Sequence, residues 1–161
     1  MRTAGPPPPD IPLEYTGFWP RVGASIIDTL MFMVITLPLL LVIYGWAYIE
    51  SDALFLGTAD VLINWVFPCI AIIAFWVYKQ ATPGKMLLEA KIVDATTGDK
   101  PSLKQYIIRY LGYFISTIPL GLGLLWVAWD ERKQGWHDKM ARTVVVNPEK
   151  KASANDQVAS S

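Results

Sequence analysis

Arg21 and Asp28 are the ionisable side chains at the start of the longest uncharged stretch of this sequence, in the segment WPRVGASIIDTLM (19–31). On a helix, seven residues make nearly two turns, so both side chains face the same side, about 10.5 Å apart along the axis. Arg21 can extend its head group to a membrane interface, whereas Asp28, deeper in the helix, costs on the order of several kcal/mol if it stays charged and unpaired in lipid. Asp28 therefore needs a partner or a proton.

Three side chains are candidate partners for Asp28. Arg21 reaches it through a bent side chain, Arg109 starts the third apolar stretch, and Ser25 lies on the same helix face one turn before Asp28. Two interpretations are open. The first is a buried structural network that sets the helix register, and the second is an ion or proton site, because carboxylates inside membranes commonly mark such paths.

The composition of the chain is typical of a membrane-embedded protein. Hydrophobic residues make up 53% of its 161 residues, charged residues only 17%, and the mean hydropathy is +0.33. The 14 basic and 14 acidic residues cancel, so there is no overall charge that favours nucleic acid as a partner. The single cysteine, Cys69, excludes a disulfide within the chain.

Two uncharged stretches are long enough to cross a bilayer as helices. Residues 29–49 and 61–78 contain 21 and 18 residues without a charge, and a helix needs about 20 apolar residues to span the hydrocarbon core. Trp65, Trp76 and Tyr78 near the ends of the second stretch are typical interfacial residues. The sequence therefore predicts two full transmembrane helices.

A third apolar stretch, residues 110–129, contains IPLGLG at 118–123, where a proline and two glycines interrupt any helix. It is either one broken span or a hairpin of two short or re-entrant helices. In the hairpin, the first arm runs from Ser102, a plausible N-cap, to residue 118, and the second arm covers 120–129.

The distribution of basic residues favours the hairpin. The segment 50–60 has no basic residue, whereas 79–109 and 132–151 have six each. Because cytoplasmic segments of bacterial membrane proteins are enriched in lysine and arginine, both basic segments are expected in the cytoplasm. A hairpin returns the chain to that side, so both termini are predicted to be cytoplasmic, in a multi-pass protein of the bacterial inner membrane.

The residues outside the apolar stretches predict a small sheet and two disordered ends. LLEAKIVD (87–94) and RTVVVN (142–147) are expected to be strands that pair on the cytoplasmic side. The proline-rich leader, 1–14, and the polar tail, 148–161, are expected to be disordered. The predicted fold is thus mainly α, with two transmembrane helices, a short or broken helical hairpin and a small β-pairing in one membrane domain, 15–147.

No enzyme motif is complete. ATPGKM (81–86) is not a phosphate-binding loop, because the glycine and the hydroxyl residue of that motif would fall at Lys79 and Met86. His137 beside Asp138 lacks a nucleophile or further metal ligands, and an ordinary interfacial histidine is the simpler interpretation. We therefore expect no enzymatic activity, no cofactor and no metal site.

Three segments in order resemble the RDD family of small bacterial membrane proteins, and the resemblance extends from Tyr15 to Asn147. The segments are GFWPRVGASIIDTL (17–30), ATPGKMLLEAKIVDATTGDKPSLKQYIIRYLGYF (81–114) and GLGLLWVAWDERKQGWHDKMARTVVV (121–146). The family is named for an arginine, an aspartate in the same helix and a further aspartate, which by position are Arg21, Asp28 and Asp138. The resemblance implies a membrane protein of a family whose general function is unknown, with transport suspected and some members associated with sodium/proton antiport.

Two functions remain open on this basis. In the first, the protein exchanges monovalent cations for protons, with Asp28 as the site and with Arg21 and Asp138 setting its pKa. In the second, it is a non-transporting membrane adaptor whose cytoplasmic face binds a partner protein. Asp138 is expected at the cytoplasmic end of the bundle, where water reaches it. Because so few helices hardly enclose a path, we expect a homo-oligomer or a partner membrane protein in the bilayer.

Overall fold

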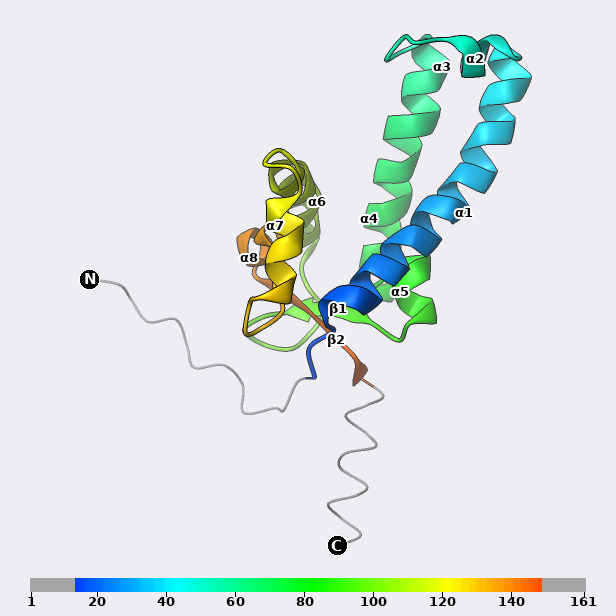
Figure 1. Cartoon of the computed structure of the whole chain (residues 1–161). Helices are drawn as coiled ribbons and strands as arrows, with labels where there is room; N and C mark the ends of the chain where they lie inside the picture. Colours follow the sequence, from blue (N-terminus) through cyan, green and yellow to red (C-terminus); the bar gives the residue numbers. More distant parts are fainter. Residues whose placement is uncertain (1–13, 149–161) are drawn as a thin grey trace, which may run out of the picture.

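A computed structural model describes residues 14–148 of the chain, which fold mainly into helices with one small sheet (Figure 1). In chain order the elements are α1 (Phe18–Tyr44), α2 (Ala47–Glu50), α3 (Thr58–Val61), the π-helical turn η1 (Leu62–Val66), α4 (Phe67–Lys79), α5 (Pro83–Leu87), β1 (Lys91–Asp94), α6 (Leu103–Thr117), α7 (Leu122–Leu125), the 3-10 turn η2 (Trp126–Ala128), α8 (Trp136–Ala141) and β2 (Thr143–Val146).

Two helical stretches are long and apolar enough to cross a membrane, as predicted. They are α1, with 27 residues, and the stretch Thr58–Leu87, with 30 residues. Only 11% and 6% of their most apolar windows are buried inside the protein, so most of this apolar surface needs a lipid environment or another protein. In Figure 1, α1 and α4 form a tall hairpin with α2 and α3 at its far end.

A polar cluster holds the far end of this hairpin together. The buried Asp60 accepts hydrogen bonds from the Asn64 side chain (2.6 Å) and from the Leu56 amide (3.1 Å). The Tyr44 hydroxyl of α1 accepts a hydrogen bond from the Asp60 backbone amide (3.1 Å). The Tyr48 hydroxyl of α2 accepts one from the Asn64 side-chain amide (2.9 Å). These bonds satisfy the buried carboxylate and join the connection to both long helices.

The third apolar stretch folds as two helical pieces. The Ser102 side chain caps α6 together with Gln105, which confirms the predicted N-cap. The expected second arm, 120–129, is not one helix but the short α7 followed by η2, and it is bent by 114° from α6. Leu120 and Gly121, with φ of 53° and 77°, form the left-handed turn between the two pieces.

The two predicted strands pair, although they are shorter than expected. β1 and β2 are antiparallel, with Lys91 opposite Val146 and Asp94 opposite Thr143. The predicted strand over 87–94 begins only at Lys91, because Leu87 still belongs to α5 and Leu88 and Glu89 form a turn. The pairing brings the segment after the second long helix next to the C-terminal part of the domain.

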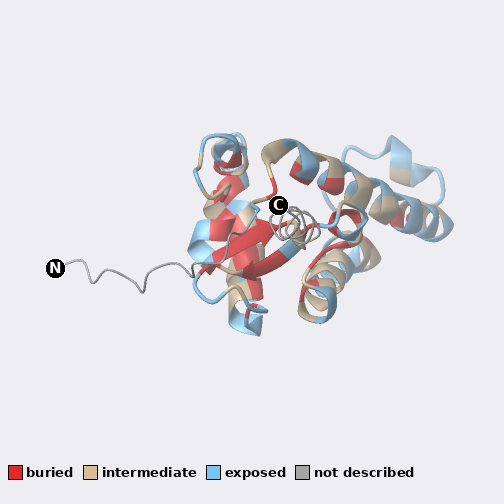
Figure 2. Ribbon diagram, turned by 90° about the horizontal axis from the view of Figure 1, so that it is seen from below, coloured by how far each residue is buried: buried red, intermediate tan, exposed pale blue. Residues whose placement is uncertain are grey.

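The buried core surrounds this sheet. Trp76, Ile92, Tyr106 and Val145 form a cluster that joins α4, β1, α6 and β2. Figure 2 shows the buried residues gathered at the sheet and the adjoining helices, while much of the outer helical surface is exposed. The sheet is therefore the point at which the helices are held together, and it positions the charged residues described below.

Two glycines allow close helix contacts near that point. A Cβ atom on Gly84 of α5 would lie 2.1 Å from the carbonyl oxygen of Ala24 in α1. A Cβ atom on Gly112 of α6 would lie 2.8 Å from the Cα atom of His137 in α8. Because real Cβ atoms are not found at such distances, the α1–α5 and α6–α8 contacts both depend on glycine.

The predicted disordered leader, 1–14, and tail, 148–161, lie outside the described residues except for Glu14 and Pro148. That part of the sequence interpretation, and with it the expected domain boundary at 15–147, stays a prediction.

Candidate functional site

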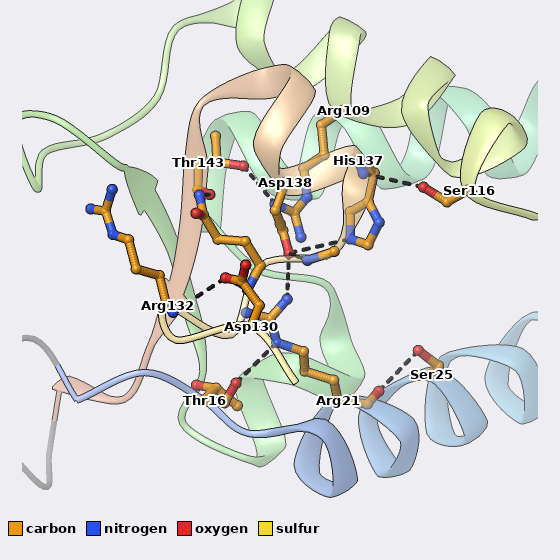
Figure 3. Close-up of polar contacts among 12 residues, drawn as sticks. Thr16, Arg21, Ser25, Arg109, Ser116, Asp130, Arg132, His137, Asp138 and Thr143 are labelled. Atoms are coloured by element: carbon orange, nitrogen blue, oxygen red, sulfur yellow. Dashed lines mark hydrogen bonds and ion pairs between the residues drawn. The ribbon is translucent and has the colours of Figure 1, made fainter. Parts of the chain in front are cut away.

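Asp138 is the centre of an ion-pair cluster that joins three helices. Arg21 of α1 donates to Oδ2 of Asp138 through Nη1, at 2.5 Å, and Arg109 of α6 donates to Oδ1 through its own Nη1. Figure 3 shows the Asp138 carboxylate between the two guanidinium groups. We refer to Arg21, Arg109 and Asp138 as the ion-pair cluster.

Further hydrogen bonds attach the cluster to the sheet and to the N-terminal segment. Arg109 Nη1 also donates to the Thr143 hydroxyl of β2 (2.7 Å), and Arg21 Nε donates to the Thr16 carbonyl oxygen (3.1 Å). The Gly135 amide donates to Oδ2 of Asp138 (3.0 Å) at the start of α8. Each member is thus held by at least two partners, as expected of a rigid structural network.

The cluster is buried, and Asp138 stays ionised. Asp138 and Arg109 have no exposed surface, and Arg21 is 9% exposed. Burial by itself would raise the pKa of Asp138, but the charges of Arg109 and Arg21 outweigh it and lower this pKa below its ordinary range. The expectation that water reaches Asp138 at the end of the bundle is wrong, because α8 packs against α6 and covers the carboxylate.

His137 lies beside the cluster as a neutral, buried side chain. Its ring stacks on Tyr113 with 4.0 Å between ring centroids, and its amide donates to the Ser116 hydroxyl (3.1 Å). Burial lowers its pKa to about 3, although Asp138, 3.5 Å from Nε2, acts in the opposite direction. His137 is 3% exposed, so it is not the interfacial histidine that the sequence suggested.

Asp28 is separate from the ion-pair cluster. It accepts a hydrogen bond from the Thr82 hydroxyl and another from the Gly84 amide at 2.7 Å. None of the three predicted partners binds it, which corrects the sequence interpretation. Ser25 donates instead to the carbonyl oxygen of Arg21 (3.0 Å), and Arg21 and Arg109 both bind Asp138.

The physical reason for this difference is the close contact between α1 and α5. Gly84 has no side chain, so α5 approaches α1 closely enough for the Gly84 amide to reach the Asp28 carboxylate. The signal in the sequence was Thr82-Pro83-Gly84, a helix start with unpaired amides, which bind carboxylates.

Lys85 is a site residue that the sequence analysis missed. It is 6% exposed, and its Nζ atom lies 5.8 Å from the centroid of the Trp76 ring. The Arg109 guanidinium lies 5.4 Å from the same ring. Among residues 14–148, the Lys85 ammonium group has no hydrogen bond and no ion pair to a carboxylate. Lys85 is one of six basic residues in the segment 79–109, which the sequence places outside the apolar spans, so no local pattern indicates its burial.

Two neighbouring cavities adjoin these residues. The first cavity, about 530 Å³, lies between α1 and α7 and is lined by Arg21, Lys85 and His137. The second cavity, about 830 Å³, lies between α1, α4 and α6 and is lined by Asp28 and, again, by Lys85. Lys85 thus borders both cavities. Within the described part of the chain, no group of three or more histidine, cysteine or acidic side chains is placed to hold a metal ion.

Comparisons with known proteins identify one family. A sequence model of the RDD family matches residues 15–142. An uncharacterized protein of Rickettsia prowazekii (strain Madrid E) is 45% identical over 78 residues, which are 48% of this chain and 43% of that protein. The proline-rich antigen homolog of Mycobacterium tuberculosis (strain H37Rv) is 36% identical over 73 residues, 43% of this chain and 30% of that protein.

The chain spans less than half the length of these curated relatives. An uncharacterized protein of Bacillus subtilis (strain 168) is 39% identical over 67 residues, 42% of this chain and 43% of that protein. No solved structure matches the chain.

Proposed function

Because this chain belongs to the RDD family, we propose that it is a multi-pass protein of the bacterial cytoplasmic membrane that exchanges monovalent cations for protons at Asp28. Asp28 binds the cation or the proton during translocation, and the exchange involves no covalent step. The ion-pair cluster, with Asp138 at its centre, is the fixed framework of the protein.

The observation that carries this proposal is the difference between the two carboxylates. Asp138 is the shared counter-ion of two buried guanidinium groups, so its protonation would leave both without a counter-charge, at a cost of several kcal/mol. Asp28 is half-buried, borders the second cavity and is bound only by two neutral donors, a hydroxyl and an amide. A carboxylate in that setting can release and take up a proton, or exchange it for a cation, without breaking an ion pair.

The proposed orientation places both termini in the cytoplasm. The β1–β2 pairing supports it, because the paired strands come from the two segments that are rich in basic residues. The bend of 114° between α6 and the α7–η2 piece supports it as well. A re-entrant arm of this kind enters and leaves the membrane on one side, provided that its backbone faces protein or water.

A second copy or a partner membrane subunit is part of the proposal. The second cavity is an open groove, and two long helices with one bent arm do not surround a path through the bilayer. Transport sites in membranes lie between repeats or subunits that can move against each other. We therefore propose that a homo-oligomer, or a complex with another membrane protein, closes the groove.

One observation favours the alternative, a non-transporting adaptor whose cytoplasmic face binds a partner protein. The two hydrogen bonds of Asp28 also hold α5 against α1, so this carboxylate has a structural role without any ion. Under this alternative, replacing Asp28 affects stability and nothing else.

Ion flux in proteoliposomes separates the two functions. We expect the purified full-length protein to couple an inward sodium or potassium gradient to proton movement, followed with a pH-sensitive dye. Asp28→Asn should abolish this movement and Asp28→Glu should retain part of it. The control is Asp52→Asn, which removes an exposed carboxylate from the far connection. If the wild-type protein shows no coupled flux, the exchange function is wrong and the adaptor remains.

A further inference from the structure

The floor of the first cavity carries cationic and polar groups that lack partners. Lys85 is only 6% exposed. Within residues 14–148 its ammonium group has no carboxylate partner. The Nη2 atom of Arg21 and the Nδ1 atom of His137 are also buried without a hydrogen bond. All three side chains line this cavity.

The charges around the cavity do not balance. Lys85, Arg21 and Arg109 are three basic side chains and Asp138 is one acidic side chain, an excess of two basic groups. Counting Asp28, which borders the adjoining second cavity, still leaves an excess of one basic group. His137 adds no charge, since burial lowers its pKa to about 3. Uncompensated charge is costly at low dielectric, so this floor is suited to an anion.

The walls above this floor are apolar. Ile26 and Leu30 of α1 face the cavity from one side, and Leu124 and Leu125 of α7 line it as well. An inorganic anion would occupy only the floor and leave these side chains uncovered. A ligand that has an anionic group at one end and a hydrocarbon chain at the other would contact both parts of the cavity.

The position of the cavity along the long helices agrees with such a ligand. Arg21 is in the first turns of the long helix Phe18–Tyr44, and Lys85 is near the end of the stretch Thr58–Leu87. Both residues therefore lie where a span would leave the hydrocarbon core, at the level of lipid head groups. Basic pockets between helices at this level are suited to acidic lipid head groups.

We propose that the first cavity is a binding site for an anionic phospholipid, with the phosphate at Lys85 and Arg21 and one acyl chain between α1 and α7. Lys85 supplies the positive charge that no carboxylate of the described chain neutralises. The free Nη2 of Arg21 supplies a directed hydrogen bond to a phosphate oxygen, while its Nη1 remains on Asp138. The site does not depend on ion exchange at Asp28.

Thermal unfolding of the full-length protein in a neutral detergent tests this site. The probes are dioctanoyl phosphatidylglycerol, dioctanoyl phosphatidylcholine and inorganic phosphate, each titrated separately, because a ligand that binds the folded state raises the melting temperature. We expect the acidic lipid to stabilise the protein at concentrations roughly tenfold lower than the zwitterionic lipid. Stabilisation by inorganic phosphate at equal concentration would show that the floor takes a free anion, and would overturn the lipid assignment.

Variants localise the binding. Lys85→Gln should weaken the response to phosphatidylglycerol by about tenfold or more, whereas Lys79→Gln, at an exposed lysine at the end of α4, should change it by less than about twofold. Equal weakening by both variants would indicate unspecific attraction to an acidic surface and overturn the proposal. If Lys85→Gln does not fold, the comparison of the two lipids on the wild-type protein still decides, and equal stabilisation by both lipids would refute the site.

Discussion

Replacing Asp138 by asparagine should be among the most destabilising polar changes in this protein, because it leaves two buried guanidinium groups without a counter-charge. Breaking a buried ion pair by removing one partner costs about 3 to 5 kcal/mol. The Arg109 side chain is completely buried, whereas the Arg21 side chain is 10% exposed and borders the first cavity. Arg109 is therefore expected to contribute the larger share, and we expect a total loss of about 4 kcal/mol.

A double-mutant cycle tests the reasoning more strictly than the single change. In the Asp138→Asn background, Arg109→Met removes the unpaired charge and keeps much of the volume. We therefore expect it to restore part of the lost stability, with a coupling free energy between the two changes of about 0.5 to 3 kcal/mol, the usual range for contacting residues. The matched control is the pair Arg21→Leu and Asp28→Asn. Asp28 binds Thr82 and Gly84 rather than an arginine, so this pair should be additive within about 0.5 kcal/mol.

The assay is reversible unfolding of the full-length protein in mixed micelles of neutral detergent and dodecyl sulfate, followed by circular dichroism. The coupling free energy is calculated from the four unfolding free energies of each cycle. Additive losses for Arg109 and Asp138 would refute the buried ion-pair cluster. A coupling between Arg21 and Asp28 as large as that between Arg109 and Asp138 would show that the two carboxylates form one network after all.

Three further predictions follow from the described contacts. Gly84→Ala should cost about 1 to 3 kcal/mol, because the new Cβ would overlap a backbone carbonyl of α1; Gly17→Ala, where nothing lies within 4 Å of that atom, is the control in the same melting experiment. Stability should fall as the pH drops below about 6.5, since the unfolded chain then protonates His137 while the folded chain, with its pKa at about 3, does not. The slope should approach about 1.4 kcal/mol per pH unit. Melting temperatures between pH 7.5 and 4.5 follow this pH dependence of stability. An unchanged pH dependence in His137→Gln would contradict its attribution to His137. In intact cells without the native cysteine, an impermeant thiol reagent should label a cysteine at Ser51 and not one at Thr96; labelling at both would disprove the proposed orientation.

Local patterns in the sequence were sufficient for most of the secondary structure. The two uncharged stretches predict the long apolar helices, because bilayer thickness sets the required length. Ser102 predicts the start of α6, because a serine side chain satisfies the free amides of a helix start. The β-branched run 142–147 predicts β2. In each case the residues that cause the element to form lie within that element or directly beside it, so the element can be inferred from a short stretch of sequence.

The candidate site was only partly predictable. The sequence, together with the family resemblance, singled out Arg21, Asp28, Asp138 and Arg109 as charged residues that need partners. It gave Arg21, Arg109 and Ser25 as candidate partners of Asp28. Both arginines instead bind Asp138, which lies 29 residues from Arg109 and 117 residues from Arg21 along the chain. No periodicity carries information over such separations.

Only the tertiary structure decided which charges meet. The contact between α6 and α8, which requires Gly112, buries Asp138 between two arginines. The contact between α1 and α5, which requires Gly84, gives Asp28 two neutral donors instead. The sequence by itself determined which charged residues need partners. The packing of the helices determined which partners they have. Ion pairs and hydrogen bonds form over a few ångströms, and distant segments come that close only after they have packed together.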